Sequence, residues 1–345
     1  MKHYFFLGAI ASLITTAHSL QSFDSWGHER IQLQDVSIHF RYSQGGKPPL
    51  LLIHGSPQHS RTWTHMGPIL AEHFTVIAPD NRGQGDSALS LSDNYTALAA
   101  GADHLAILNF LNISKTYVFS HDKGAGLAAS LALENPERIE KIVFSEYALP
   151  GMRGYSTEVT SPDPYQNWQL AFFAVPDVAQ FFIQGKERQM LEWYFWHSSY
   201  SGTDVISNDL LDVYARAISK PGFLRAMFQY FAAAFEDEKY FKAVLAGKGK
   251  LQMPVLAMGG EALFSPPEIL SQAWGPVAAN LETAVVPKAG HWIADENPVW
   301  VANHAIQFFG NSTLPGLDLS SLADLTTMFG ILGNTMLTPG INGIA

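Results

Sequence analysis

One stretch decides the fold: Tyr117-Val118-Phe119-Ser120-His121-Asp122-Lys123-Gly124-Ala125-Gly126. Residues 117–120 are largely aromatic and β-branched, which predicts a short buried strand. Residues 124–134 are rich in Ala and Leu, which predicts a helix that ends at Asn135-Pro136. Small residues at positions 120 and 124 allow a sharp strand-to-helix turn to close around Asp122. The pattern predicts a nucleophile held clear of the backbone, with Asp where such turns usually carry Ser.

The composition is that of a folded globular protein. The 345 residues are 47% hydrophobic and 15% charged. The formal net charge is −10 with no basic run, so neither nucleic acid nor an anionic lipid surface is expected as a partner. Cysteine is absent, which excludes disulfides and a Cys nucleophile. No metal-site spacing occurs, and no metal or other cofactor is expected; the oligomeric state stays open.

Residues 1–19 have the pattern of a secretory signal peptide. A basic Lys2 precedes an apolar run over residues 4–14, with small residues at 17 and 19, which predicts cleavage after Ser19. The alternative is a short membrane anchor, but the apolar run is too short to span a bilayer comfortably. No stable membrane insertion is therefore expected after signal removal. Secretion agrees with three N-glycosylation sequons, at Asn94, Asn112 and Asn311.

The chain divides into a core, an insertion and a tail. Residues 20–150 and 251–310 alternate buried strands with helices, which predicts an α/β fold with a mostly parallel sheet. Residues 151–250 contain aromatic, amphipathic stretches, the last of which ends at Phe235, and predict a helical cap. Residues 311–345 form a Gly-, Ser- and Leu-rich tail that could either pack or stay mobile.

The carboxyl ends of the predicted strands carry the residues suited to catalysis, because ligands of open parallel sheets bind there. Asp122 can attack carbon as a carboxylate and form an ester that water must then cleave. His291, in Gly290-His291-Trp292, is the expected base for that water. Backbone N–H groups of Ser56 and Lys123 are expected to stabilise the oxyanion. The alternative role for Asp122 is to cap the helix that follows it.

A histidine base needs an acid to orient it, and two residues are candidates. Glu261 follows the predicted strand 255–258, but Leu263 occupies the position where an acid is common. Glu146 ends the strand that follows the elbow, so its strand can be the neighbour of the elbow strand. Glu146 is the preferred acid, and Glu261 is expected to close a turn.

These motifs together resemble the α/β-hydrolase superfamily, and more closely its epoxide hydrolases and haloalkanoate dehalogenases with an aspartate nucleophile. The resemblance rests on segments similar to their H-G-x-P, D-x-R-G-x-G-x-S, H-D-x-G and G-H-W motifs, at residues 54–57, 80–87, 121–124 and 290–292. Residues 145–151 are similar to a subgroup whose catalytic Glu follows the sixth strand. The resemblance covers about residues 28 to 309 and implies the α/β-hydrolase fold with the triad Asp122, His291 and Glu146.

The cap departs from this resemblance at its proton donors. Epoxide hydrolases protonate the opening oxygen with two cap Tyr residues or a cap His and Tyr. Here Trp168 is followed by Gln169 where the similar subgroup has His, and Phe231 stands at the partner Tyr position, one step after Tyr230. These four residues are expected to line the substrate pocket. A proton could come from a shifted position, with Tyr230, Tyr165 and Tyr155 as the candidates.

The leading hypothesis is a secreted, epoxide-hydrolase-like enzyme that acts on an apolar small molecule. The aromatic residues of the cap suit such a ligand. A second hypothesis is a biosynthetic isomerase or cyclase that uses the triad for acid–base chemistry without an ester. A third is a non-catalytic protein whose cap binds a hydrophobic ligand.

Overall fold

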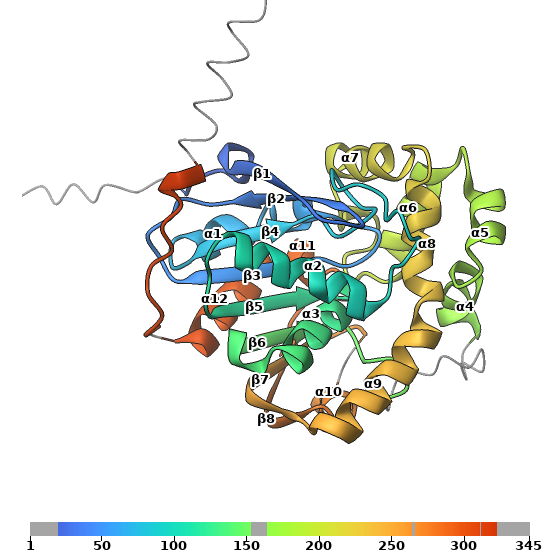
Figure 1. The fold of residues 1–345 in the computed structure, drawn as a ribbon. Coiled ribbons are helices and arrows are strands. Elements are labelled where there is room, and N and C mark those ends of the chain that lie inside the picture. Colours follow the sequence, from blue (N-terminus) through green and yellow to red (C-terminus); the bar gives the residue numbers. More distant parts are fainter. Residues whose placement is uncertain (1–19, 153–163, 264–265, 311, 323–345) are drawn as a thin grey trace, which may run out of the picture.

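A computed structural model describes residues 20–152, 164–263, 266–310 and 312–322, with the side chains of 164–167 excepted. Its eight strands are β1 Gly27–Gln32, β2 Ser37–Tyr42, β3 Pro49–Ile53, β4 Thr75–Pro79, β5 Thr116–His121, β6 Ile139–Ser145, β7 Leu251–Gly260 and β8 Ala278–Val286. They form one sheet in the order β1-β2-β4-β3-β5-β6-β7-β8 (Figure 1). β2 pairs antiparallel with β1 and β4, and the other pairs are parallel. The predicted α/β architecture is confirmed.

Helices cover both faces of the sheet and one of its ends. The α-helices are α1 Gly67–Ala71, α2 Ala97–Phe110, α3 Lys123–Glu134, α4 Pro164–Phe173, α5 Pro176–Ile183, α6 Glu187–His197, α7 Asn208–Ile218, α8 Phe223–Ala232, α9 Ala234–Lys248, α10 Pro267–Trp274, α11 Ile293–Glu296 and α12 Pro298–Phe309. Residues of α2, α3 and α10 share one hydrophobic cluster, and residues of α1, α11 and α12 share another. Among the described helices, none is long and apolar enough to cross a membrane.

The central strands are buried at every position and mostly apolar because helices cover them on both sides. Every residue of β3, β4 and β5 is buried. β1, at the edge of the sheet, instead alternates between more and less exposed residues along most of its length. Because β3 pairs parallel with β5, and β5 with β6, the carboxyl ends of these three strands lie side by side, at the end of the sheet that the cap covers (Figure 1).

Helices α4 to α8 gather at this end of the sheet as the cap (Figure 1). Their buried residues form a third hydrophobic cluster, which is rich in aromatic rings and includes Trp292 of the core. The Trp292 ring lies 4.5 Å from the Phe195 ring of α6, and its Nε1 donates to the Phe195 carbonyl oxygen at 2.9 Å. The cap is therefore anchored directly beside His291.

Helix α9 extends beyond the last helical stretch that the sequence predicts, which ends at Phe235. Its sequence is rich in charged residues, and its apolar residues do not gather on one side of the helix. Phe241 and Val244 nevertheless bury in the same cluster as α2 and α3, and the Tyr240 hydroxyl lies 3.0 Å from Ser130 Oγ of α3. Burial against the core, not an amphipathic repeat, accounts for this helix.

The tail packs on the core as far as residue 322. The Leu317 amide donates to the Lys47 carbonyl oxygen at 2.9 Å, and the Leu317 carbonyl oxygen accepts from the Gly46 amide at 2.8 Å. Leu317, Leu319 and Leu322 bury their side chains in the core. Packing, one of the two alternatives that the sequence left open, thus holds for residues 312–322, and residues 323–345 lie outside the described chain.

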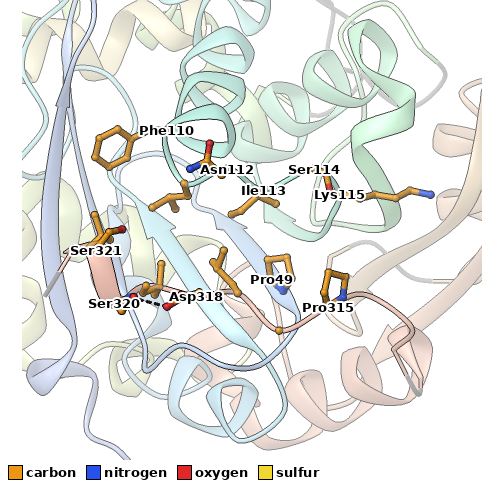
Figure 2. A pocket seen from close by; sticks show the side chains of 15 residues that line it. Pro49, Phe110, Asn112, Ile113, Ser114, Lys115, Pro315, Asp318, Ser320 and Ser321 are labelled. Atoms are coloured by element: carbon orange, nitrogen blue, oxygen red, sulfur yellow. Dashed lines mark hydrogen bonds between the residues drawn. The ribbon is translucent and has the colours of Figure 1, made fainter. Parts of the chain in front are cut away.

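A cavity of about 350 Å³ lies between this tail and residues 110–115 (Figure 2). Pro49, the first residue of β3, also lines it, so the cavity opens at the amino ends of the parallel strands. Asp122 lies at their carboxyl ends. The cavity is therefore a crevice beside the tail and lies away from the predicted catalytic residues.

Candidate active site

Asp122 lies in the turn between β5 and α3, with φ 50° and ψ −133°. A residue with a side chain rarely adopts such a conformation, and holding it costs about 1–3 kcal/mol. Two neighbouring strands support it. The Asp122 amide donates to the Ser145 carbonyl oxygen of β6 at 2.9 Å, and a Cβ at Gly124 would collide with the His54 carbonyl oxygen that follows β3. The turn therefore has room only for glycine at position 124.

The Asp122 side chain does not cap α3. Its Oδ1 instead accepts a hydrogen bond from the Ser56 amide at 2.9 Å. Gly55 allows this approach, because a Cβ there would collide with the carboxylate. The structure thus brings together Asp122 and one of the two predicted oxyanion donors. The other donor, the amide of Lys123 at the start of α3, stays a prediction.

The segment that carries Ser56 is braced by buried polar residues. His54 Nε2 accepts from the Asn81 amide at 2.9 Å, and Gln84 Nε2 donates to Ser56 Oγ at 2.7 Å. His54 is fully buried, and its burial lowers its pKa. These contacts support the loop and leave His54 outside the catalytic group.

Among the described residues, His39, Asp80 and Asp86 lie close enough together to suggest a cation site. Hydrogen bonds already occupy Asp80, whose Oδ2 contacts His39 Nδ1 at 2.8 Å and the Asp86 amide at 2.9 Å. Its Oδ1 accepts from the Ser60 amide at 2.8 Å. The group is best understood as a brace between β2, the end of β4 and the segment after Ser56.

His291 joins the two predicted carboxylates. Its Nε2 lies 3.4 Å from Asp122 Oδ2, and its Nδ1 lies 3.1 Å from Glu146 Oε2. Glu146 follows β6 with φ 54°, and its Oε1 accepts from the Gly260 amide. Glu261 lies elsewhere, at a turn where its carboxylate accepts from the Lys288 amide at 2.8 Å. Glu146 is thus the carboxylate that contacts His291.

The three buried groups shift one another's pKa. Burial lowers the pKa of His291, but the contacts with Asp122 and Glu146 outweigh it and raise the value to about 10. Burial alone would raise the pKa of Asp122, but the contact with His291 and its charge hold that pKa below its usual value. Burial raises the pKa of Glu146, and the hydrogen bond to His291 offsets only part of this. An imidazolium paired with an ionised Asp122 is therefore the resting state near neutral pH.

Phe231 of the cap lies next to Lys123, the residue that follows Asp122. Lys123 is 5% exposed, and its Nζ lies 4.5 Å from the centre of the Phe231 ring and 5.5 Å from that of Tyr147. Gln169 of α4 is 4% exposed, and within the described chain its Oε1 has no hydrogen-bond partner. A buried cation and a buried amide oxygen thus lie beneath the cap.

Two residues predicted to line the pocket have other positions. Trp168 is 47% exposed, and its ring lies 5.3 Å from the Trp193 ring on the outer side of the cap. The Tyr230 hydroxyl donates to the Arg82 carbonyl oxygen at 2.8 Å, and burial raises its pKa well above the usual value. Neither is arranged as a proton donor to a substrate at Asp122. The side chains of Tyr155 and Tyr165 lie outside the described residues.

His121 contacts the predicted base and was missed from the sequence. Its Nε2 lies 2.7 Å from the His291 carbonyl oxygen, and the two rings are 4.9 Å apart. Burial lowers the pKa of His121 to about 4, so it is neutral and able to donate this hydrogen bond. Its place in the H-D-x-G segment, directly before Asp122, was the available signal.

The alpha/beta hydrolase fold family matches residues 48–298, and the chain belongs to this family. Eight mostly parallel strands, an elbow at Asp122 and an inserted cap are the features that agree with it.

Among the relatives is the soluble epoxide hydrolase of Corynebacterium sp. (strain C12), which is 28% identical over 82% of this chain and 96% of that protein. The fluoroacetate dehalogenase of Burkholderia sp. is 23% identical over 80% of this chain and 91% of that protein. The solved structure of the epoxide hydrolase CorEH without ligand has a TM-score of 0.75 and 28% identity, and the match covers 82% of this chain and 98% of that one.

The raised pKa of His291 predicts a pH-dependent stability. A folded-state pKa near 10, against 6.5 in the unfolded chain, gives stability that is present below pH 6.5 and is lost as pH rises toward 10. The thermal midpoint of the wild type should therefore fall between pH 7 and pH 10, and that of His291→Gln should fall less. Between pH 7 and pH 10, the wild type should lose more free energy of unfolding than His291→Gln, by on the order of 1 kcal/mol or more, since one unit of pKa shift is worth about 1.4 kcal/mol.

His104→Gln is the matched control for this measurement. Burial lowers the pKa of His104 to about 3, so this residue is neutral throughout the same pH range. The thermal midpoint of this control should fall with pH as steeply as that of the wild type. Equal slopes for the wild type and His291→Gln would contradict the assigned charge state.

Proposed function

We propose that this chain is an epoxide-hydrolase-like enzyme in which Asp122 is the nucleophile, His291 the base and Glu146 the residue that orients His291. One observation carries the proposal: the imidazole of His291 bridges the two buried carboxylates, at 3.4 Å from Asp122 and 3.1 Å from Glu146. The family and its epoxide hydrolase relatives support this chemistry. An apolar small molecule is the proposed substrate, in keeping with the aromatic cap.

In the first step, Asp122 Oδ2 attacks an epoxide carbon. The carbon–oxygen bond of the ring breaks as the ester bond to Oδ2 forms, and the released oxygen takes a proton. The Ser56 amide holds Oδ1 at 2.9 Å, which leaves Oδ2 as the attacking atom. The low pKa of Asp122 keeps the carboxylate ionised for this attack.

In the second step, His291 takes a proton from water, and the resulting hydroxide attacks Cγ of the ester. The oxyanion forms on Oδ1, where the Ser56 amide already donates. The bond from Cγ to Oδ2 then breaks, and Oδ2 takes the proton from the His291 imidazolium as it leaves with the product. The water oxygen remains in Asp122, whose new carboxyl group gives its proton back to His291. A diol and a free carboxylate result.

Ester formation also prepares the base. The Asp122 carboxylate is one of the two anions that raise the pKa of His291 to about 10. An ester has no charge, so alkylation removes this contribution and lowers the pKa of His291. The imidazole then loses its proton more readily at the stage where a neutral base is needed.

Isotope labelling tests this mechanism directly. A single turnover of styrene oxide with excess protein in ¹⁸O-labelled water should place the heavy oxygen in the peptide that contains Asp122, with unlabelled diol as product. Asp122→Asn should lower turnover by about 10³-fold or more. His291→Gln should accumulate the ester, visible as added mass on the same peptide.

The matched control is Asp209→Asn, at an exposed residue of α7, which should turn over at the wild-type rate. Label that appears only in the product would overturn the ester mechanism. Isomerised or cyclised product without added water would favour an isomerase or cyclase instead, for which the unusual Gln169 and Phe231 already argue. Ligand binding that survives Asp122→Ala and His291→Ala, with no turnover by the wild type, would favour a binding protein.

We propose Lys123 as the source of the proton for the released oxygen. Displacement at carbon puts the leaving oxygen opposite Oδ2, and His291 Nε2 faces Oδ2. The donor must therefore lie on the other side of the carbon. Lys123 adjoins Asp122 in sequence, is buried, and directs its ammonium group to the Phe231 ring of the cap at 4.5 Å.

Lys123→Met should slow ester formation from styrene oxide by about 10²- to 10⁴-fold, the usual value of a general acid. Lys123→Arg should be slow as well, because a guanidinium keeps the charge but does not release a proton. Ethylamine should restore part of the rate to Lys123→Ala. Lys141→Met is the control, since Lys141 also lies over a ring, that of Phe308 at 5.5 Å, far from Asp122 in the fold. If Lys123→Met formed the ester at the wild-type rate, Lys123 would not be the proton donor.

We also propose that the chain enters the secretory pathway, on the strength of residues 1–19 and of the exposed Asn94 and Asn112 side chains. Residues 1–19 and Asn311 lie outside the described chain. Expression in a eukaryotic secretory host should yield medium protein that begins at Leu20 and loses mass with peptide N-glycosidase. Protein that stays in the cell with Met1 intact would contradict secretion.

A further inference from the structure

Glu296, the last residue of α11, reaches back to the loop that carries His291. Its Oε2 accepts a hydrogen bond from the Gly290 amide at 2.6 Å. Its Oε1 accepts from the amides of Tyr200 and Ser201, each at 2.7 Å. Tyr200 and Ser201 belong to the cap segment that follows α6. One carboxylate therefore receives three backbone hydrogen bonds from two parts of the fold.

The same cap segment touches His291 directly. The His291 amide donates to the Ser198 carbonyl oxygen at 2.7 Å. Gly290 packs closely on this segment, because a Cβ there would lie 2.5 Å from the Ser198 carbonyl oxygen and 2.8 Å from the Tyr200 amide. The backbone of the His291 loop and the backbone of residues 198–201 thus form one interlocked unit, and Glu296 holds both sides.

We propose that Glu296 is a positioning residue that locks the His291 loop to cap residues 198–201, so that the base is aligned with Asp122 only while the cap is in place. This inference rests on the proposed function of the same site. Hydrogen bonds to an ionised acceptor are roughly twice as strong as neutral ones. A catalytic group displaced by about 1 Å can lose about 10²-fold in rate. His291 Nε2 already lies 3.4 Å from Asp122 Oδ2, so a further displacement of this size would separate the two groups.

The two chemical steps depend on this lock to different degrees. Asp122 is held by hydrogen bonds with the Ser56 amide and with β6, and neither partner is hydrogen-bonded to the Glu296 side chain in the described part of the chain. Alkylation should therefore continue when Glu296 is changed. Hydrolysis of the ester needs His291 and should suffer. A general loss of folding would instead slow both steps together.

The test compares Glu296→Ala and Glu296→Gln with Glu261→Ala by rapid-quench kinetics on styrene oxide. In Glu296→Ala, ester hydrolysis should fall about 10- to 100-fold while alkylation stays near the wild-type rate, so the ester accumulates. Ester hydrolysis by Glu296→Gln should have a rate between those of the wild type and Glu296→Ala, since the single carbonyl oxygen of Gln can accept from only one side of the lock. Glu261 is the matched control because its carboxylate holds the Lys288 amide at the start of the same loop. Glu261→Ala should not accumulate ester.

Hydrogen exchange gives a second reading that does not require catalysis. Glu296→Ala should speed amide exchange in both residues 198–201 and residues 288–292, and Glu261→Ala should leave residues 198–201 unchanged. Faster exchange in both segments supports the lock even if wild-type Asp122 takes up no label, which would sink the ester mechanism alone. An unchanged ratio of hydrolysis to alkylation in an enzyme that does form the ester would overturn the proposal. So would exchange that changes in neither segment.

Discussion

Two buried carboxylates share one imidazole, and the rest of the site depends on this balance of charge. Asp122 and Glu146 are both almost completely buried, where an unpaired carboxylate is costly. His291 contacts both and is charged as a result, with a pKa near 10. The buried Lys123 is also among the charges that lower the pKa of Asp122.

The backbone keeps these groups at fixed distances through two strained residues. Asp122 and Glu146 have φ values of 50° and 54° and stand at the ends of the adjacent parallel strands β5 and β6. The Asp122 amide donates to β6, and the Glu146 amide donates to the Met258 carbonyl oxygen of β7 at 3.0 Å. Each strand end is thus tied to the next strand of the sheet. The sheet supplies the rigidity that two unfavourable conformations require, which suits residues that must hold their position.

The sequence was sufficient where chemistry and spacing constrain each other. The elbow around Asp122, the G-H-W segment and the absence of an acid at Leu263 led to the group that the structure brings together. It was insufficient where tertiary packing decides which side of a helix faces inward. Successive helical residues point about 100° apart, so Trp168 faces out while Gln169 is buried. Likewise, Tyr230 bonds to the Arg82 loop while Phe231 faces Lys123. Glu296 gave no motif signal, because its partners are backbone amides distant in sequence.

The cap and the core are therefore less separate around His291 than their boundaries in sequence suggest. The core holds Asp122, Glu146 and the Ser56 amide, but the His291 amide donates to Ser198 of the cap, and Trp292 is part of the cap's own hydrophobic cluster. Because its neighbours are bound to the cap, His291 cannot be treated as independent of cap position. Movement of α6 to admit a substrate would strain the hydrogen bond between His291 and Ser198. In such an arrangement the position of the cap and the position of the His291 backbone are coupled through one hydrogen bond.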